Sequence, residues 1–442
     1  MTTHGAPTVA GPIDPEGSAG DGLDSTPSWQ KITPVQRSRL LAILLAVGVI
    51  NYADRPLLSV LLEPIKAEFG ASDTMLGLLS GVAFSLFYAT LGIPVARLSD
   101  RVDRPRIIAV MIAIWSAMSI LCGLASSFWL LALARIGVGA GEAGAVPASQ
   151  GLIADAYPPE ERAKALSIYM LSSTIGLLIA TVCGPWIAEH YGWRTAFVAI
   201  SAPGLVIVGI VMRFLVEPRA SIAPSAMEPL GSAFLLLWRK PSYRGMVIGV
   251  VLYFLLAYGA FVFFPSYLVR THGMSLTEAG TLFGVSNAAG GLAGTYLAGV
   301  LASRLAQDDP RWFLRLPALC LLACLPVLAV FLTTGSLAAL WITLLLASLF
   351  TGGALPPIFA ALHFVCGSQR RATAVAIMFF FGNLIGLGLG PLLTGAASDI
   401  LAAGRGDAEG LRIALLVTCG LFVPCALALW RAGNMVAHDK EI

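Results

Sequence analysis

Four ionisable side chains lie deep inside long apolar stretches of the sequence, and they are Asp54, Arg55, Arg135 and Glu142. A charge at the centre of a bilayer costs about 3 kcal/mol or more, so ionisable residues found there usually carry function. Arg135 and Glu142 are seven residues apart, about two helical turns, and therefore share one face of a helix. The neighbours Asp54 and Arg55 point about 100° apart on their own helix. If the two helices pack together, two acids and two bases can neutralise one another, and we expect Arg135 to be the partner of Glu142.

Such a cluster can couple substrate binding to protonation. A carboxylate beside an arginine stays ionised, and its proton affinity rises when the arginine is drawn to another anion. An anionic substrate that competes for an arginine would therefore load a proton onto one of the acids. The alternative is a static set of buried salt bridges that only holds the helices in register. We interpret the four residues as the proton-coupling and substrate-binding group.

The rest of the candidate site is polar and aromatic rather than charged. The second half of the chain has many Phe and Tyr residues but no charge deep in its apolar stretches. An aromatic wall that faces a charged wall suits an amphipathic anion, with its head near the arginines and its tail against the rings. For any single Phe, packing against lipid or another helix is the competing explanation. The residues predicted to line the cavity are Tyr52, Tyr253, Tyr258, Asn287 and Asn383.

The sequence does not favour an enzyme. Residues 139–144 match the Gly-x-Gly-x-x-Gly pattern of dinucleotide-binding folds, but no strand precedes them and they lie inside an apolar stretch. The seven cysteines lie within or at the ends of apolar runs, as small buried hydrophobic residues do. No combination of nucleophile, base and metal ligands is found. We therefore expect no catalytic residue, no metal site and no cofactor.

The elements that must position these residues are membrane-spanning helices. The chain has 442 residues, of which 57% are hydrophobic and 12% are charged, and its mean hydropathy is +0.81. Soluble domains are roughly 45–50% apolar and about 25% charged, and a bilayer admits only helices or closed barrels. The apolar runs are about 20 residues long, which suits helices. Twelve spans are predicted, near residues 38–64, 73–97, 106–126, 128–154, 164–188, 194–215, 244–269, 277–303, 314–333, 337–363, 372–401 and 411–431.

Lys and Arg residues set the orientation of these spans. They are frequent in one set of connections, whereas the opposite set contains only Lys66, Arg194, Arg270, Arg405 and Arg412. We therefore expect a multi-pass protein of the inner (cytoplasmic) membrane with both termini cytoplasmic. The predicted organisation is a disordered cytoplasmic tail (1–37), an N-terminal six-helix bundle (38–215), a cytoplasmic linker with an interfacial helix (216–243), a C-terminal six-helix bundle (244–431) and a cytoplasmic C-terminal tail (432–442).

Three short motifs recur in the same order in the two halves, at similar offsets, which indicates duplicated six-helix units. The repeated pairs are 96–101 with 299–304, 162–165 with 371–374, and 184–185 with 390–391. The Gly-Pro pairs among them are expected to form hinges or bends.

The motif after the second span resembles a signature of the major facilitator superfamily: a small residue, three more residues, Asp-Arg, and further basic residues. Here Ala96 and Asp103 stand where that family usually has Gly. The resemblance implies an all-α membrane protein with the major facilitator fold, in which twelve transmembrane helices form two six-helix halves related by pseudo-two-fold symmetry. It also implies a cytoplasmic gate at Asp100 and Arg101, although a topology signal of loop charges is the competing explanation. Arg104 and Arg106 are interpreted as topology determinants rather than gate residues.

A narrower resemblance appears in the first and fourth spans. The run Asn51-Tyr-Ala-Asp-Arg55 looks like the Asn-Tyr-x-Asp-Arg of the Spinster family, and residues 135–143 fit that family's fourth span. Spinster proteins are implicated in moving sphingosine phosphate and lysophospholipids, and bacterial relatives need not all share that substrate.

The sequence thus predicts a proton-coupled secondary transporter that works by alternating access on an amphipathic organic anion, such as a lysophospholipid or sphingoid phosphate. A carrier of small carboxylates or drugs is the alternative within the class, and a transporter-like membrane sensor is the alternative outside it. The expected partners are the small amphipathic substrate, protons and the lipid bilayer. The net charge of +3 is too small to indicate a nucleic-acid partner. The chain is expected to act as a monomer.

Overall fold

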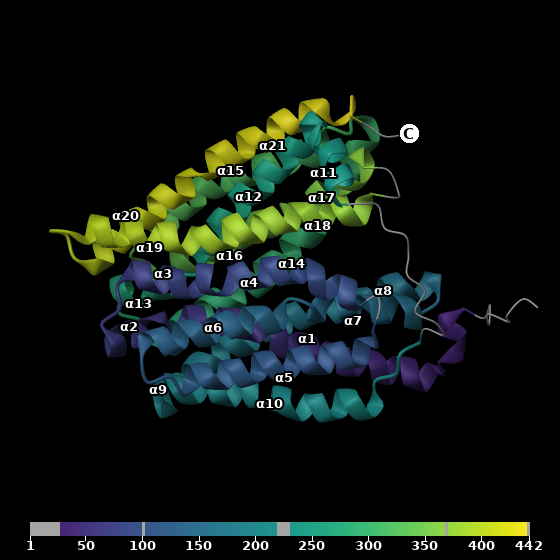
Figure 1. Cartoon of the computed structure of the whole chain (residues 1–442). Helices are drawn as coiled ribbons and strands as arrows, with labels where there is room; N and C mark the ends of the chain where they lie inside the picture. The colour runs from purple at the N-terminus through teal and green to yellow at the C-terminus, as the bar shows by residue number, and fades with distance from the viewer. Residues whose placement is uncertain (1–26, 100–101, 219–229, 367–369, 440–442) are drawn as a thin grey trace, which may run out of the picture.

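The computed structural model describes residues 27–99, 102–218, 230–366 and 370–439, and these ranges are helical with no strand. Figure 1 shows two bundles of long, roughly parallel helices lying side by side. The first bundle contains α1 (Pro34–Val60), α2 (Leu62–Phe69), α3 (Asp73–Ser80), α4 (Val82–Ser99), α5 (Arg104–Gly123), α6 (Phe128–Glu142), α7 (Ala145–Ala156), α8 (Pro159–Leu178), η2 (Ile179–Cys183), α9 (Gly184–Tyr191) and α10 (Trp193–Phe214).

The second bundle repeats this arrangement after the short helix α11 (Leu230–Trp238). It contains α12 (Pro241–Phe261), α13 (Phe264–His272), α14 (Leu276–Asp308), α15 (Trp312–Phe331), α16 (Leu337–Gly352), α17 (Leu355–Val365), α18 (Arg371–Phe381), η3 (Gly382–Leu387), α19 (Gly388–Ala402), α20 (Asp407–Gly420) and α21 (Phe422–Val436).

Eleven helical stretches in the described ranges are long and apolar enough to cross a membrane. The remaining predicted span corresponds to α14, whose 33 residues would extend about 50 Å. Several glycines and polar side chains lower its hydropathy, but it packs among the other long helices against α15 and α16. Several spans consist of two consecutive helices, as where α3 ends and α4 begins around Gly81.

The Gly-Pro pairs predicted to bend their helices follow π-helical turns in both halves. The turn η2 directly precedes Gly184, and η3 ends just before the helix that contains Pro391. A π-helical turn inserts one extra residue into the helix and commonly marks a functional site. Its presence at equivalent places in both halves agrees with the predicted repeat.

The two halves meet along two lines of close helix packing. One line joins α3 and α4 to α19 and η3, and the other joins η2, α8 and α9 to α14. Glycine permits both approaches, because a Cβ at Gly77 would overlap the carbonyl oxygen of Pro391 and a Cβ at Gly284 would overlap the hydroxyl of Thr181. Small residues allow this kind of contact between membrane helices.

Both ends of the described chain lie on the same side of the molecule, at the right of Figure 1. We call this side the termini end and the opposite side the far end. The predicted disordered tail is too long, because the described part of it contains the turn η1 (Ser28–Lys31) and α1 already begins at Pro34. Thr33 and Gln36 form a capping box that starts α1. At the other terminus, α21 extends to Val436, five residues beyond the predicted last span.

Candidate functional site

The four deep ionisable residues form two ion pairs that join α1 to α6. Arg55 Nη2 lies 3.0 Å from Glu142 Oε2, and Arg55 Nε also donates to that oxygen at 3.1 Å. Arg135 Nη1 pairs with Asp54 Oδ2. The neutral cluster expected from the sequence is therefore present, but the expected pairing of Arg135 with Glu142 is wrong. Two helical turns separate those residues by about 10 Å along the axis, so each one reaches across to α1 instead.

The two ion pairs differ in how many of the carboxylate oxygens accept a hydrogen bond. Asp54 accepts from Arg135 through one oxygen and from the hydroxyl of Ser119 on α5 through the other. Glu142 accepts only through Oε2, and its Oε1 is buried with no hydrogen-bond partner among the described residues. An unsatisfied buried oxygen is costly and marks a place where a proton or water is stabilising.

Exposure separates Arg55 from the other three residues. Asp54, Arg135 and Glu142 are at most 3% exposed, whereas the side chain of Arg55 is 25% exposed. Arg55 is therefore the most accessible member of the cluster.

Two aromatic rings that the sequence reasoning missed hold the Arg55 guanidinium in place. Its carbon Cζ lies 4.4 Å from the ring centroids of both Phe84 and Tyr88 on α4, and these rings stack 5.2 Å apart. Arg135 also lies over Phe84, at 5.4 Å. Phe84 and Tyr88 are four residues apart in the second predicted span, so the sequence already indicates that both rings lie on one face of a helix. That spacing could have predicted a joint cation–π contact with an arginine.

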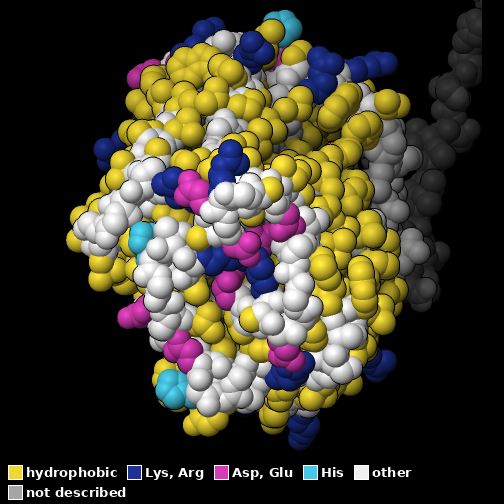
Figure 2. Space-filling model, turned by 90° about the vertical axis from the view of Figure 1, so that its left-hand side faces the viewer, with side chains coloured by type: hydrophobic (Ala, Val, Ile, Leu, Met, Phe, Trp, Pro, Cys, Tyr) yellow, Lys and Arg dark blue, Asp and Glu magenta, His cyan; other side chains and the backbone are white. Residues whose placement is uncertain are grey.

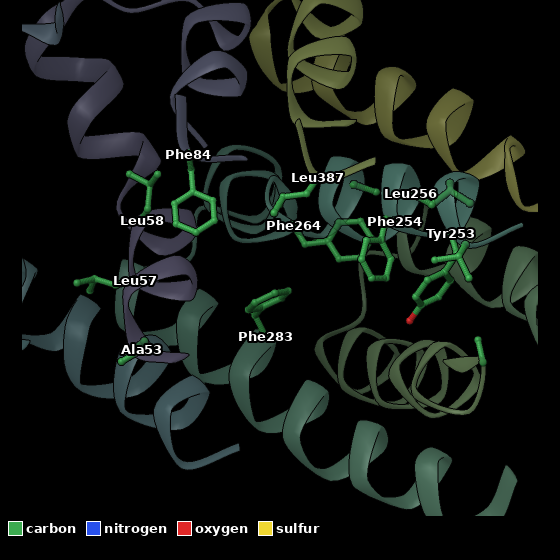
Figure 3. Packing of buried hydrophobic residues seen from close by; sticks show 14 of the residues in the cluster. Ala53, Leu57, Leu58, Phe84, Tyr253, Phe254, Leu256, Phe264, Phe283 and Leu387 are labelled. Atoms are coloured by element: carbon green, nitrogen blue, oxygen red, sulfur yellow. The ribbon is translucent and has the colours of Figure 1, made fainter. Parts of the chain in front are cut away.

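Buried apolar side chains from both halves surround this region. Figure 3 shows Leu57, Leu58 and Phe84 on the first-half side and Phe254, Phe264, Phe283 and Leu387 on the second-half side. All seven belong to one continuous hydrophobic core. The apolar core therefore runs continuously from the first half into the second.

The predicted cavity residues divide into two groups. Tyr52 on α1 and Tyr258 on α12 lie within interaction range of Arg55, and Tyr258 comes from the opposite half. Tyr253 does not join the cluster, because it is buried and donates its hydroxyl to the Thr351 carbonyl at 2.9 Å.

The two predicted cavity asparagines are partly buried, and each donates to its own helix one turn back. Asn287 Nδ2 lies 2.8 Å from the Phe283 carbonyl, and Asn383 Nδ2 lies 2.9 Å from the Phe379 carbonyl. The helix therefore fixes the orientation of each amide and leaves its oxygen as the group that can meet a ligand.

The predicted gate residues Asp100 and Arg101 lie outside the described residues. Their neighbour Arg104 is described and has a structural role that the sequence did not predict. It is buried and pairs with Asp155 Oδ2 at 2.7 Å and with Glu217 Oε2 at 3.0 Å. These contacts tie the start of α5 to the end of α7 and to the segment after α10. Arg106 is exposed.

Ion pairs at the far end link the two halves. The sequence analysis considered two of these residues, Lys66 and Arg270, only as signals of membrane topology and did not identify their acidic partners. Arg270 of α13 pairs with Glu63 at 2.8 Å and with Asp73 at 2.7 Å, and Lys66 pairs with Asp73 and Asp407 at 2.8 Å each. We call these five residues the far-end network. Figure 2 shows acidic and basic side chains gathered at the centre of this face. Burial opposes the charge of Lys66, but its hydrogen bonds to Asp407 and Asp73 outweigh burial and raise its pKa.

Two helix ends reinforce the far-end network. Asp399 of α19 accepts from the backbone N–H groups of Asp73 and Thr74 at 2.9 and 2.8 Å and so caps the start of α3. Glu189 of α9 accepts from the N–H of Thr277, at 2.9 Å, at the start of α14. In each case a carboxylate of one half accepts from the start of a helix in the other half. Hydrogen bonds at the far end therefore stabilise both the contact of α3 with α19 and the contact of α9 with α14.

Known proteins resemble this chain over nearly its whole length. The chain matches the Major Facilitator Superfamily over residues 44–391. It is 34% identical over 403 residues to an MFS-type efflux pump of Mycolicibacterium smegmatis, covering 90% of this chain and 93% of that protein. It is 27% identical over 396 residues to human protein spinster homolog 1, covering 84% of this chain and 74% of that protein.

A solved structure has the same arrangement of helices. It is a bacterial homolog of the human lysosomal transporter Spinster, in an inward-facing and unoccupied conformation, with a TM-score of 0.84 and 29% identity. The match covers 93% of this chain and 100% of that chain. The protein is thus a multi-pass membrane transporter and not an enzyme, it resembles the Spinster proteins, and it belongs to the major facilitator superfamily.

Proposed function

We propose that this chain is a proton-coupled secondary active transporter of an amphipathic organic anion. One observation carries the proposal: the reachable Arg55 is held by Glu142, whose second carboxylate oxygen has no partner among the described residues. A cation that can be drawn away from a buried acid is the arrangement that links anion binding to proton uptake.

The coupling step follows from the ion pair. A substrate phosphate or carboxylate that binds Arg55 competes with Glu142 for the guanidinium. Glu142 is then a buried carboxylate without its counter-charge, so it takes up a proton at the oxygen Oε1. Because this step binds substrate and proton together, movement of both in one direction is symport.

Asp54 is expected to play a different part from Glu142. Both of its oxygens are satisfied, by Arg135 and by Ser119, and all three residues are buried. A substrate would have to break two contacts to free this carboxylate. We therefore assign proton exchange to Glu142 and the positioning of α1 against α6 to Asp54 and Arg135.

The substrate class follows from what surrounds Arg55. The rings of Phe84 and Tyr88 and the apolar second-half surface suit the chain of a lysophospholipid or sphingoid phosphate, with its anionic head on the guanidinium. A small carboxylate is the second candidate, favoured by 26% identity over 412 residues to a probable L-galactonate transporter of Escherichia coli. A drug is the third, favoured by the resemblance to the efflux pump.

Alternating access requires that each end of the molecule can close and open. In this proposal the far-end network closes one end, and Asp100 and Arg101 take part in closing the other. The transporter would act as a monomer in the inner membrane, with both termini in the cytoplasm.

Purified protein in liposomes with an imposed pH gradient tests the coupling. Wild-type protein is expected to accumulate substrate in response to the gradient, whereas Glu142→Gln should bind and exchange substrate without accumulating it, because Arg55 remains. Glu68→Gln, in an exposed ion pair with Arg194, is the matched control and should behave like wild type. Gradient-driven accumulation by Glu142→Gln at the wild-type level would remove Glu142 from the coupling step.

A thermal-shift comparison tests the substrate class. Lysophospholipids and sphingoid phosphates should raise the unfolding temperature of wild-type protein, and Arg55→Gln should abolish that increase. If only small sugar acids or drugs stabilise the protein and are transported, the amphipathic-anion assignment is wrong. If no ligand is transported while ligands still bind, the chain is a sensor.

A further inference from the structure

Two arginines at the termini end of the first half share one aromatic ring. Arg39 lies in the second turn of α1, and Arg213 lies in the last turn of α10 next to Phe214. The Arg39 guanidinium carbon is 5.6 Å from the Phe214 ring centroid, and that of Arg213 is 5.3 Å from it. The two guanidinium carbons are therefore at most about 11 Å apart, although they come from the first and last spans of the first six-helix bundle.

Neither arginine has a carboxylate partner among the described residues, and both are exposed. This contrasts with Arg104 at the same end, which is buried between two acids. Two like charges repel each other, and cation–π attraction of both to the Phe214 ring offsets part of this repulsion. The pair therefore carries a net positive charge that a bound anion would neutralise.

The surface next to the two arginines is apolar and exposed. Val35 is 68% exposed, Met212 57%, Phe214 44% and Val216 44%. All four lie at the first turn of α1 or the end of α10, where a membrane-spanning segment meets the headgroup layer. An anion bound here would thus have apolar side chains beside it. A phospholipid brings acyl chains that can cover such side chains, whereas a free ion brings nothing that would.

We propose that Arg39, Arg213 and Phe214 form a binding site for the phosphate headgroup of an anionic phospholipid in the leaflet at the termini end. A guanidinium donates two parallel hydrogen bonds to phosphate oxygens, so two of them can hold one headgroup from both sides. The acyl chains would then lie along the apolar face of α10. The site is separate from the Arg55 cluster and does not depend on the transport proposal.

The test compares lipid binding by full-length protein in detergent, using native mass spectrometry and thermal unfolding with dioleoyl phosphatidylglycerol or phosphatidylcholine. Wild-type protein should retain phosphatidylglycerol more tightly. Arg39→Gln/Arg213→Gln should lower that affinity about tenfold or more, since each guanidinium supplies charge-assisted hydrogen bonds to the same bound phosphate. Phe214→Leu, which keeps both charges, should lower it about fivefold.

The matched control is Arg244→Gln/Arg431→Gln, which removes two exposed arginines from the same end of the second half. It should change the affinity for phosphatidylglycerol less than twofold, because exposed charges that do not contact the bound headgroup are screened by solvent and salt. An equal loss in this control would mean that only the overall surface charge attracts lipid and would overturn the proposal. Unchanged affinity in both first-half variants would also overturn it, as would equal stabilisation of wild-type protein by inorganic phosphate alone.

Discussion

Adjacent residues on α1 serve two separate ion pairs because a helix turns about 100° per residue. Asp54 points to the buried Arg135, while Arg55 points to Glu142 and is partly exposed. The seven-residue spacing on α6 lets both partners face α1 at different heights. One short stretch of α1 can therefore hold a fixed pair and an exchangeable pair side by side.

This difference predicts unequal stability costs for removing the two acids. Asp54→Asn leaves Arg135 charged, buried and unpaired, which should cost about 3–5 kcal/mol. Glu142→Gln leaves Arg55, which is 25% exposed and held by two rings, so the cost should be about 1 kcal/mol. Thermal unfolding of the two purified variants in the same detergent measures the difference. Equal destabilisation would mean that both pairs are static supports.

At the scale of helices, the contact between α3 and α19 combines close packing with charge. Gly77 lets the α3 backbone approach Pro391, and Asp399 caps the first turn of α3 from the opposite half. Asp73 sits at this same point and pairs with both Arg270 and Lys66. The start of α3 is thus the place where the far-end network is most concentrated.

Replacing Asp73 should loosen this end. Asp73→Asn keeps the shape of the side chain but removes the charge shared by two cations, and we expect the population with an open far end to rise about tenfold or more. Spin labels on Ala67→Cys and Ala403→Cys, in a background without native cysteines, report the distance between the halves.

Glu68→Gln is the control for this measurement, because Glu68 pairs with Arg194 at the same end but within one half. It should leave the distance distribution as in the wild type. A distribution that is also unchanged in Asp73→Asn would mean that helix packing alone keeps the far end closed.

At the scale of the whole molecule, the two halves have the same plan but different chemistry. Both contain a π-helical turn before a Gly-Pro pair. Among the described residues, the deep charges lie in the first half, and the second half supplies apolar and aromatic side chains. In the proposed transport cycle, this asymmetry would let one substrate meet a charged wall and an apolar wall together.

The orientation of the whole molecule in the membrane is a separate prediction. The described chain ends lie on one side, and the Lys and Arg distribution predicts that this side is cytoplasmic. A membrane-impermeant thiol reagent applied to intact cells should therefore fail to label a cysteine added at either terminus. It should label Ala403→Cys at the far end. Labelling of a terminus from outside would reverse the orientation and the directions assigned to both gates.

The sequence by itself determined the number of spans, the repeat and the four deep charges, because each depends on local composition or on spacing along one helix. Hydropathy over about 20 residues and the cost of charge in a bilayer do not require knowledge of neighbouring helices. Tertiary structure alone decided that Arg55 pairs with Glu142, that Phe84 and Tyr88 hold Arg55, and that Asp73 links the halves. These contacts join residues far apart in the chain. Their geometry depends on how the helices are rotated and displaced against one another, which no single helix encodes.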